Sequence, residues 1–324
     1  MDIGANKWLL LNMKISRLIF PLIIIFLMYS VGAYSKKFSC GEHLNVDYLF
    51  AKMIEIDGLP EKTIYFEQIN MLKDNRYAEL KYLYNQCIFS RVTHNSLARL
   101  NKKNLHKLYF ILNAIFRFTQ DVKVMNEIDD IIIEKELRGE NTETYIKQKI
   151  KNLISIRKFS EAKELENKLG NSKTLIPQIV FSAAKNNDND QDIYTIYKPN
   201  LMNETYNEVN FKIPKGGYII GVLSPICNAS KRFSKWLKDN NKIQERLNQN
   251  TLFIVPQEIP FEFADNKQMM LSFIKNKYDW QFVTYWGTPT LYFFYDGKLI
   301  GQLIGWPEKG NKVRFSQLMS KINL

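Results

Sequence analysis

Cysteine and histidine are scarce in this chain of 324 residues, with three of each. No two of these side chains have the spacing of a zinc site, and His43, His94 and His106 are scattered. We therefore expect no metal site and no cofactor. The chain also lacks an arginine-rich stripe and a nucleic-acid-binding motif, although its formal net charge is +12. We interpret that charge as a solvated basic surface and expect no nucleic-acid partner.

Long apolar runs are also rare, and the clearest one lies near the N-terminus, in MKISRLIFPLIIIFLMYSVGAYS (residues 13–35). Lys14 and Arg17 precede the run, and the small residues Ala33 and Ser35 follow it at the spacing of a cleavage site. Residues 1–35 are therefore predicted to hold a secretory signal peptide.

Two questions about this segment stay open. The start is Met1 or Met13, and the alternative to cleavage is an uncleaved membrane anchor, because the apolar residues 18–31 with their flanks nearly span a thin bilayer. In both cases the basic residues stay inside and the remainder of the chain is exported. We expect the protein in the periplasm or at the periplasmic face of the inner membrane, with membrane contact only through an uncleaved N-terminal segment.

Export determines how the cysteines are interpreted. In an oxidising compartment, an odd number of cysteines leaves one without a partner in the same chain. Cys40 and Cys87 lie in the same N-terminal region and are the candidates for a structural disulfide, which leaves Cys227 over. The alternative is that all three are small buried residues with free thiols.

The two parts of the chain differ in their hydrophobic periodicity. Apolar residues recur every three to four positions up to about residue 170, which predicts helices. The expected helical segments are residues 46–59, 61–92, 101–137 and 142–170, with Gly170 ending the last one. We predict an α-helical array or bundle over residues 36–172.

From residue 173 onward, short β-branched or aromatic runs alternate with amphipathic segments. Strands are expected in TLIPQIVFSAA, DIYTIYKPN, GGYIIGVLSPIC, TLFIVP and, as a hairpin joined by an Asp-Gly turn, in TPTLYFFYDGKLIGQLIGWP. Helices are expected in ASKRFSKWLKDNNK, NKQMMLSFIKNKY and KVRFSQLMSKI. The prediction is an α+β protein of two domains, an all-α array followed by an α/β domain over residues 173–324.

Two motifs within residues 190–324 resemble those of the thioredoxin superfamily. In that family a strand delivers Cys-x-x-Cys to a helix N-terminus, usually followed by lysine, and the match is Cys227-Asn228-Ala229-Ser230-Lys231. About 60 residues later the family places a cis-proline opposite that cysteine, ahead of a strand, a turn with glycine and a final strand. Thr288-Pro289 in GTPTLYFFYDGKLIGQLIGW matches that signature. The resemblance implies a thioredoxin-like fold, with Cys227 as nucleophile and Thr288 and Pro289 as the substrate-docking backbone.

The chain also departs from the family's pattern. Ser230 stands in place of the second cysteine, so that Cys227 has no neighbouring thiol to release it from a mixed disulfide. Gly221 stands where the family usually has a buried acid that assists the second thiol. Ile226 replaces the usual tryptophan, and Ala229 replaces the usual proline. These departures are consistent with a monothiol site or with a dithiol site that has lost its chemistry.

Two functions follow from this pattern. In the first, Cys227 is the nucleophile of a monothiol oxidoreductase, Ser230 is a hydrogen-bond partner of its thiolate, and Lys231 adds positive charge near a helix N-terminus. Its partners would be protein or peptide thiols and disulfides, with glutathione or a partner reductase resolving the mixed disulfide. In the second, the protein is a redox-inactive binding or assembly module of the bacterial cell envelope.

Overall fold

The computed structural model describes residues 40–41, 43–57, 62–66, 69–73, 76–170, 176–181, 193–200, 202–203, 205–261 and 270–324. Two compact units divide the chain, Met1–Glu42 and His43–Leu324, and the second contains all the helices and strands named below. The predicted signal peptide or anchor over residues 1–35 lies outside the described residues. Among the described residues, no helix combines the length and the apolar character needed to cross a membrane.

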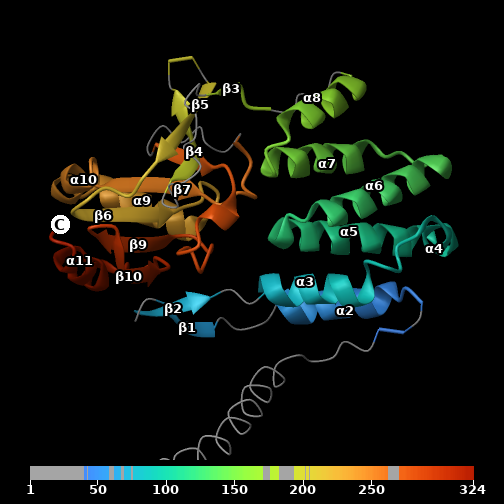
Figure 1. The fold of residues 1–324 in the computed structure, drawn as a ribbon, viewed down its shortest axis with the longest axis horizontal. Helices are drawn as coiled ribbons and strands as arrows, with labels where there is room; N and C mark the ends of the chain where they lie inside the picture. The colour runs from blue at the N-terminus through green and yellow to red at the C-terminus, as the bar shows by residue number, and fades with distance from the viewer. Residues whose placement is uncertain are drawn as a thin grey trace, which may run out of the picture. The chain divides into compact units, whose positions relative to one another are not determined.

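The first part of the second unit is mainly helical (Figure 1). Its helices are α2 (Val46–Asp57), α3 (Arg76–Cys87), α4 (His94–Arg99), α5 (Lys102–Thr119), α6 (Val122–Leu137), α7 (Glu143–Ser155) and α8 (Phe159–Lys168). Helix α5 is in contact with α2, α3 and α6, and α7 is in contact with α6 and α8. Helix α5, the longest among the described residues, begins at the capping side chain of Asn101 and ends at Gln120, whose left-handed backbone (φ 50°) separates it from α6.

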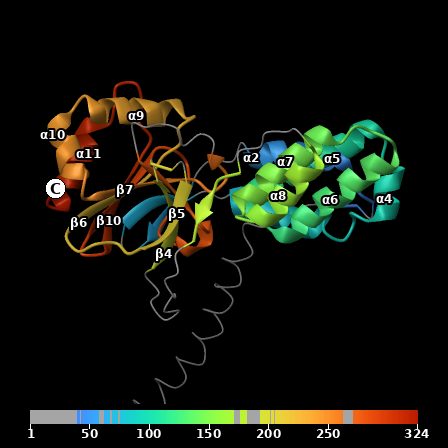
Figure 2. The ribbon, with the colours of Figure 1, turned by 90° about the horizontal axis from the view of Figure 1, so that it is seen from above.

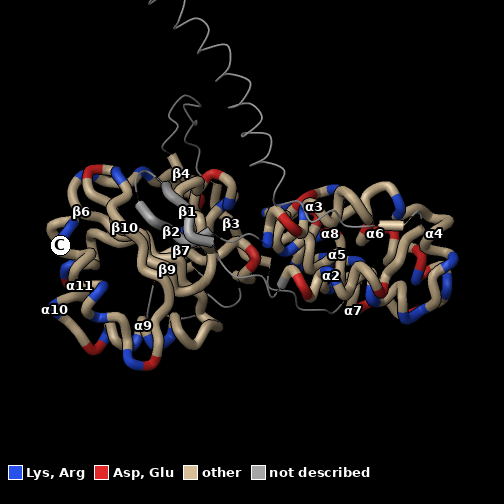
Figure 3. The backbone as a smooth tube through the Cα atoms, turned by 90° about the horizontal axis from the view of Figure 1, so that it is seen from below, with Lys and Arg blue, Asp and Glu red and all other residues tan. Residues whose placement is uncertain are grey.

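Basic and acidic residues are interleaved along these helices (Figure 3). Several form ion pairs one turn apart, such as Lys147 with Glu143 at 2.5 Å and Lys158 with Glu161 at 2.7 Å. This distribution is that of a solvated helical surface.

Two predictions for the helical part need correction. Residues 61–92 are not one helical segment, because β1 (Lys62–Phe66) and β2 (Ile69–Lys73) form an antiparallel hairpin before α3 begins. The run Thr63 to Phe66 is β-branched and aromatic, which favours a strand over a helix. Residues 101–137 form two helices because the chain turns at Gln120.

The remainder of the described chain forms a mixed sheet with helices (Figure 2). The strands are β3 (Ile179–Val180), β4 (Tyr194–Asn200), β5 (Thr205–Phe211), β6 (Gly217–Val222), β7 (Thr251–Val255), β8 (Leu271–Ile274), β9 (Thr290–Tyr295) and β10 (Lys298–Ile304). The helices are α9 (Asn228–Lys238), α10 (Asn241–Leu247) and α11 (Lys312–Lys321), with a 3₁₀ turn, η2, at Lys277–Asp279.

In the described residues the strand order of the sheet is β10-β9-β6-β7-β8-β4-β5-β3. Strand β6 is central: it pairs in parallel with β7 and antiparallel with β9. Five of its six residues are buried, as expected for a strand covered on both faces. Because β6 leads into α9, the segment between them starts from a buried strand of the sheet.

One aromatic cluster covers the sheet on the side of α9 and α11. The ring of Trp306 lies 5.0 Å from Phe233 and 4.7 Å from Trp236, and Trp236 lies 5.2 Å from Phe315. Arg232 on α9 donates two hydrogen bonds to the Trp306 carbonyl, at 3.1 and 3.0 Å. These contacts fix the orientation of α9 relative to the end of β10.

The predicted hairpin is confirmed, because β9 and β10 are antiparallel and Asp296-Gly297 connects them. Both turn residues have positive φ, 48° and 77°, which is the geometry that favours this dipeptide in a two-residue turn. The predicted helix over residues 266–278 is wrong. Its described part contains strand β8, all four residues of which are buried, and a buried apolar run of that length does not distinguish strand from helix.

Hydrogen bonds connect the helical part to the sheet within the second unit. Arg157, in the turn after α7, donates to the Ile274 carbonyl of β8 through Nε (3.0 Å) and Nη2 (2.7 Å). Gln257 donates to the Ser155 carbonyl at 2.9 Å and accepts from the Lys277 backbone N–H at 2.7 Å. The predicted domain boundary near residue 172 lies outside the described residues and stays a prediction.

Candidate functional site

Cys227 lies at the start of helix α9, five residues after Val222, at which strand β6 ends. It is the N-cap residue, with φ −81° and ψ 124°, and its carbonyl accepts the Lys231 N–H at 3.0 Å as the first bond of the helix. The first N–H groups of a helix have no acceptor within the helix and lie at the positive end of its dipole. The thiol is therefore at a position that favours its anionic form.

The Thr288–Pro289 peptide bond is cis, and this segment lies against the thiol. Cys227 Sγ is 3.1 Å from the Thr288 carbonyl oxygen, which accepts from the thiol. On the other side, the Pro289 carbonyl accepts from the Gly305 N–H at 2.8 Å. The two sequence motifs, 61 residues apart, thus meet in space.

The thiol is partly buried, and several groups act on its pKa. Burial raises the pKa of Cys227, whereas the Thr288 side chain, the backbone N–H groups of Ser230 and Ala229, and the Ser230 side chain lower it. The hydrogen bonds outweigh burial, so that the pKa lies below the ordinary value of a thiol. The Thr288 carbonyl oxygen can accept a hydrogen bond only from the protonated thiol of Cys227.

Ser230 is 2% exposed and has a structural role in addition to its effect on the thiol. Its hydroxyl oxygen accepts the Ser224 N–H at 3.2 Å, which closes the loop between β6 and α9. Lys231 is exposed, and in the described residues no hydrogen bond joins its ammonium group to the Cys227 thiol. Its predicted effect on the thiolate stays a prediction.

The packing around Gly221 leaves no room for a side chain. A Cβ atom at Gly221 would lie 2.7 Å from Phe253 Cδ1 and 3.0 Å from Leu291 Cδ2. Contacts this short require the ring or the strands to move. The neighbouring strands are therefore packed for glycine.

The three cysteines are in two chemical states. Cys40 and Cys87 are disulfide-bonded, and Cys227 is a free thiol. In this state neither of the first two has a thiol that can resolve a mixed disulfide at Cys227. No group of three metal-ligating side chains occurs among the described residues.

A cavity of about 750 Å³ opens beside Cys227. One wall comes from the sheet part of the second unit and includes Ser224, Cys227 and Thr288. The opposite wall comes from helices α3 and α5 and includes Arg76 and Arg117. A cavity of this volume is within the range of ligand-binding sites.

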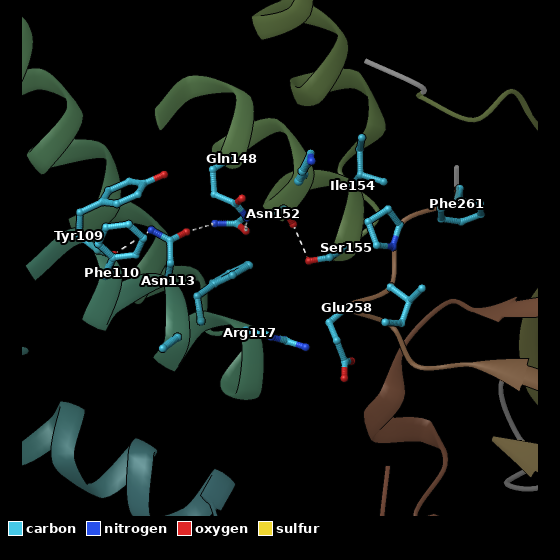
Figure 4. A pocket seen from close by; sticks show the side chains of 15 residues that line it. Tyr109, Phe110, Asn113, Arg117, Gln148, Asn152, Ile154, Ser155, Glu258 and Phe261 are labelled. Atoms are coloured by element: carbon cyan, nitrogen blue, oxygen red, sulfur yellow. Dashed lines mark hydrogen bonds between the residues drawn. The ribbon is translucent and has the colours of Figure 1, made fainter. Parts of the chain in front are cut away.

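A second cavity, of about 430 Å³, lies between α5, α7 and the segment 258–261 (Figure 4). Amide side chains form a hydrogen-bonded chain along one side of it. Gln148 donates to Asn152 at 3.0 Å, Asn152 donates to Asn113 at 2.8 Å, and Asn113 donates to the Tyr109 carbonyl at 2.8 Å. Cys227 is not among the described residues that line this cavity.

Sequence reasoning did not identify the helical residues of the thiol cavity. Arg76 and Arg117 lie in segments that were predicted to be helical, and neither was assigned a functional role. Trp280 lies in a segment to which no role was assigned. No local signal marks them, because their proximity to Cys227 depends on how the helices pack against the sheet.

Comparisons with known proteins add little to this description. No family model matches the chain, and no curated protein matches it. A structural match exists to a thioredoxin-like protein from Bacteroides caccae ATCC 43185, whose crystal structure has a resolution of 1.90 Å. The match has 14% sequence identity and a TM-score of 0.26, and it covers 80% of this chain and 98% of that one. At this TM-score, it supports no conclusion about fold or activity.

Proposed function

We propose that this protein is a thioredoxin-like protein that carries out thiol–disulfide exchange through a single nucleophile, Cys227. The observation that supports the proposal most directly is the placement of the thiol at the N-terminus of α9, against the carbonyl of Thr288. A lowered thiol pKa at this position increases the fraction of thiolate, which is the reactive form. The order of β6, α9, cis-Pro289 and the β9–β10 hairpin is also the order that the resemblance implies.

The exchange needs no cofactor. The Cys227 thiolate attacks one sulfur of a substrate disulfide; a bond forms between the two sulfurs, the substrate S–S bond breaks, and the second substrate sulfur leaves as a thiolate. A thiol from a second molecule then attacks the mixed disulfide, forms a disulfide with the substrate sulfur and returns Cys227 as a thiolate. Ser230 has no sulfur, and therefore the second thiol comes from a small thiol or a partner protein.

The remaining residues have supporting roles in this proposal. The backbone of Thr288 and Pro289 docks an extended peptide beside the sulfur. Ser230 stabilises the thiolate, and Lys231 adds positive potential near the helix N-terminus. The disulfide-bonded state of Cys40 and Cys87 is consistent with the proposed export to an oxidising compartment.

The test is the rate of alkylation of Cys227 as a function of pH in the protein with its disulfide intact. Because Cys227 is then the free thiol, a Cys227→Ser variant supplies the background. We expect the rate to follow an apparent pKa below the roughly 8.5 of an unperturbed thiol. An apparent pKa at or above that value, or no reaction of the folded protein, would contradict the proposal.

A redox-inactive binding module is the second candidate. It is favoured by the cavity of about 750 Å³, to which the helices and the sheet both contribute. An inert Cys227 in the alkylation experiment would support this candidate. A rapid reaction with a low apparent pKa would support exchange chemistry.

A further inference from the structure

The segment that leads to Thr288 forms part of the wall of the thiol cavity. Its residues 283–287 belong to no helix or strand, and several of them line the cavity together with Cys227. Backbone N–H and C=O groups outside helices and strands need other partners when they are removed from water. The partners of this half-buried segment therefore determine where Thr288 lies relative to the thiol.

One buried hydroxyl binds both backbone polar groups of Tyr285. The Tyr292 hydroxyl donates to the Tyr285 carbonyl at 2.9 Å and accepts the Tyr285 N–H at 3.1 Å. It also accepts from Nε2 of Gln302 at 3.1 Å. Burial raises the pKa of Tyr292, so that the hydroxyl keeps its proton at neutral pH. Because a phenolic hydroxyl both donates and accepts, this one side chain restrains the position and the orientation of the Tyr285 backbone.

A second hydroxyl binds the segment at Gly287. Oγ1 of Thr290 donates to the Gly287 carbonyl at 2.5 Å. Thr290 and Tyr292 are alternate residues of β9, so that their side chains lie on the same face of the strand, and both are fully buried. The segment is thus attached to β9 at two points before Thr288.

The backbone on either side of Thr288 is restrained as well. A Cβ atom at Gly287 would overlap the Tyr285 ring, which shows that this ring lies directly on the Gly287 backbone. After Thr288, the Pro289 carbonyl accepts the Gly305 N–H at 2.8 Å. The carbonyl of Thr288, which contacts the thiol, therefore lies between two attached neighbours.

Strand β9 is a rigid support for the two hydroxyls. It lies between β6 and β10, and Tyr292 is paired with Ile220 of β6 and with Gln302 of β10. The Tyr292 ring packs at 5.6 Å from the ring of Phe282. Because β6 is also the strand that leads to Cys227, adjacent strands carry the thiol and the hydroxyls. Side chains on regular strands are placed more precisely than those on loops.

We propose that the hydroxyls of Tyr292 and Thr290 position the Thr288 backbone against Cys227 and thereby determine how fast an extended peptide disulfide reacts. Neither residue is among the described residues that line the thiol cavity, so that both act through the segment and are positioning residues. This inference rests on the proposed exchange function and adds two residues of β9 to the site.

The experiment compares two disulfide reagents on the protein with its own disulfide intact. One is a short uncharged peptide whose cysteine carries a 2-pyridyl disulfide, and the other is 2,2′-dipyridyl disulfide, which has no peptide backbone to dock. In both reactions the Cys227 thiolate forms a new S–S bond, the S–S bond of the reagent breaks, and the leaving sulfur departs as pyridine-2-thione after taking up a proton. Its absorbance gives the rate, and the ratio of the two rates measures docking.

In Tyr292→Phe, the ratio of the peptide rate to the small-reagent rate should fall about tenfold, because the docking backbone is no longer held in place. The apparent pKa of the thiol should rise, since the Thr288 side chain lowers it in the unmodified protein. The matched control is Tyr109→Phe, which removes a buried hydroxyl that donates to the Tyr145 carbonyl at 3.2 Å in the helical part. It should leave both the ratio and the pKa unchanged.

A second pair of variants keeps the test independent of whether Tyr292→Phe folds. Thr290→Val removes the hydroxyl that binds Gly287 and keeps the branched side chain, whereas Thr290→Ser keeps the hydroxyl and loses the methyl group. We expect the rate ratio to fall in Thr290→Val and to be retained in Thr290→Ser. The opposite result, a loss in Thr290→Ser alone, would assign Thr290 to packing and overturn its positioning role.

The remaining outcomes separate this inference from the proposed function. A folded Tyr292→Phe protein with an unchanged rate ratio and an unchanged pKa would overturn the positioning role and leave the exchange function intact. A loss of rate in equal proportion for both reagents would also overturn it, because general destabilisation does not distinguish a peptide from a small disulfide. Slow reaction of the unmodified protein with both reagents would overturn the exchange function itself.

Discussion

The thiol loop before α9 and the contact between α3 and α6 each bury one titratable side chain, with opposite effects on its pKa. At Cys227, hydrogen bonds outweigh burial and lower the pKa. At Glu127 on α6, burial raises the pKa to about 8, and the Tyr84 hydroxyl on α3 opposes this only in part. One oxygen of the Glu127 carboxyl group, Oε2, has no hydrogen-bond partner in the described structure.

The position in the helix explains the difference. Cys227 lies at the N-terminus of α9, where backbone N–H groups are available to a negative charge. Glu127 lies in the interior of α6, where the N–H groups are already used by the helix, and Asp130 and Asp121 raise its pKa further. Burial alone therefore does not predict the direction of a pKa shift, because the hydrogen-bond donors available to the charged form also contribute.

The largest expected effect on the free energy of unfolding comes from replacing Glu127, whose burial disfavours its charged form. The folded state retains the Glu127 proton up to about pH 8, whereas the unfolded chain releases it near 4.5. The stability due to this group is present below pH 4.5 and is lost as the pH rises toward 8. Between these two pH values the unmodified protein should lose on the order of 3 kcal/mol of unfolding free energy, and Glu127→Gln should abolish that loss.

Urea unfolding at about pH 5.5 and pH 8.5 measures this effect. The variant should be more stable than the unmodified protein at the higher pH, with a smaller dependence on pH. Glu164→Gln, at an exposed position on α8, is the control and should leave the dependence unchanged. If the stability of Glu127→Gln depends on pH as strongly as that of the unmodified protein, ionisation of Glu127 costs the folded state little free energy.

A smaller effect is expected behind the thiol, at Gly221. Replacement by alanine places Cβ 2.7 Å from Phe253 Cδ1, and relief of this overlap should cost about 1–3 kcal/mol of unfolding free energy. Gly301→Ala is the matched change, because its Cβ would approach one terminal atom, Leu318 Cδ2 at 2.6 Å, whereas a Cβ at Gly221 would approach two atoms of the Phe253 ring and one of Leu291. Equal destabilisation of the two variants would show that the packing around Gly221 adapts easily.

The smallest effect is expected for Ser230→Ala. The change leaves the buried Ser224 N–H without its acceptor and should cost roughly 1 kcal/mol. It also removes one group that lowers the pKa of Cys227, and therefore the alkylation profile should shift to higher pH. Ser234→Ala, whose hydroxyl donates to the Ser230 carbonyl, is the control and should leave that profile in place. A profile unchanged in Ser230→Ala would limit Ser230 to a structural role.

The sequence predicted correctly those secondary-structure elements that are determined by their own residues. The Asp296-Gly297 turn, the strand leading to Cys227 and the final amphipathic helix formed where they were expected. The segments 61–92 and 266–278 were interpreted incorrectly, because short apolar runs fit a strand as well as a helix. Strand β5 had no prediction, since its sequence, TYNEVNF, is mostly polar.

The sequence by itself identified Cys227, Ser230, Thr288 and Pro289 as a candidate site, because each belongs to a short motif. The resemblance already implied that Thr288 and Pro289 lie opposite Cys227, whereas only the tertiary structure determined that Arg76 and Arg117 line the same cavity. A local motif depends on a few neighbouring residues, so that it can be recognised in the sequence. The walls of a cavity depend on packing between segments far apart in the chain, for which no single segment carries a signal.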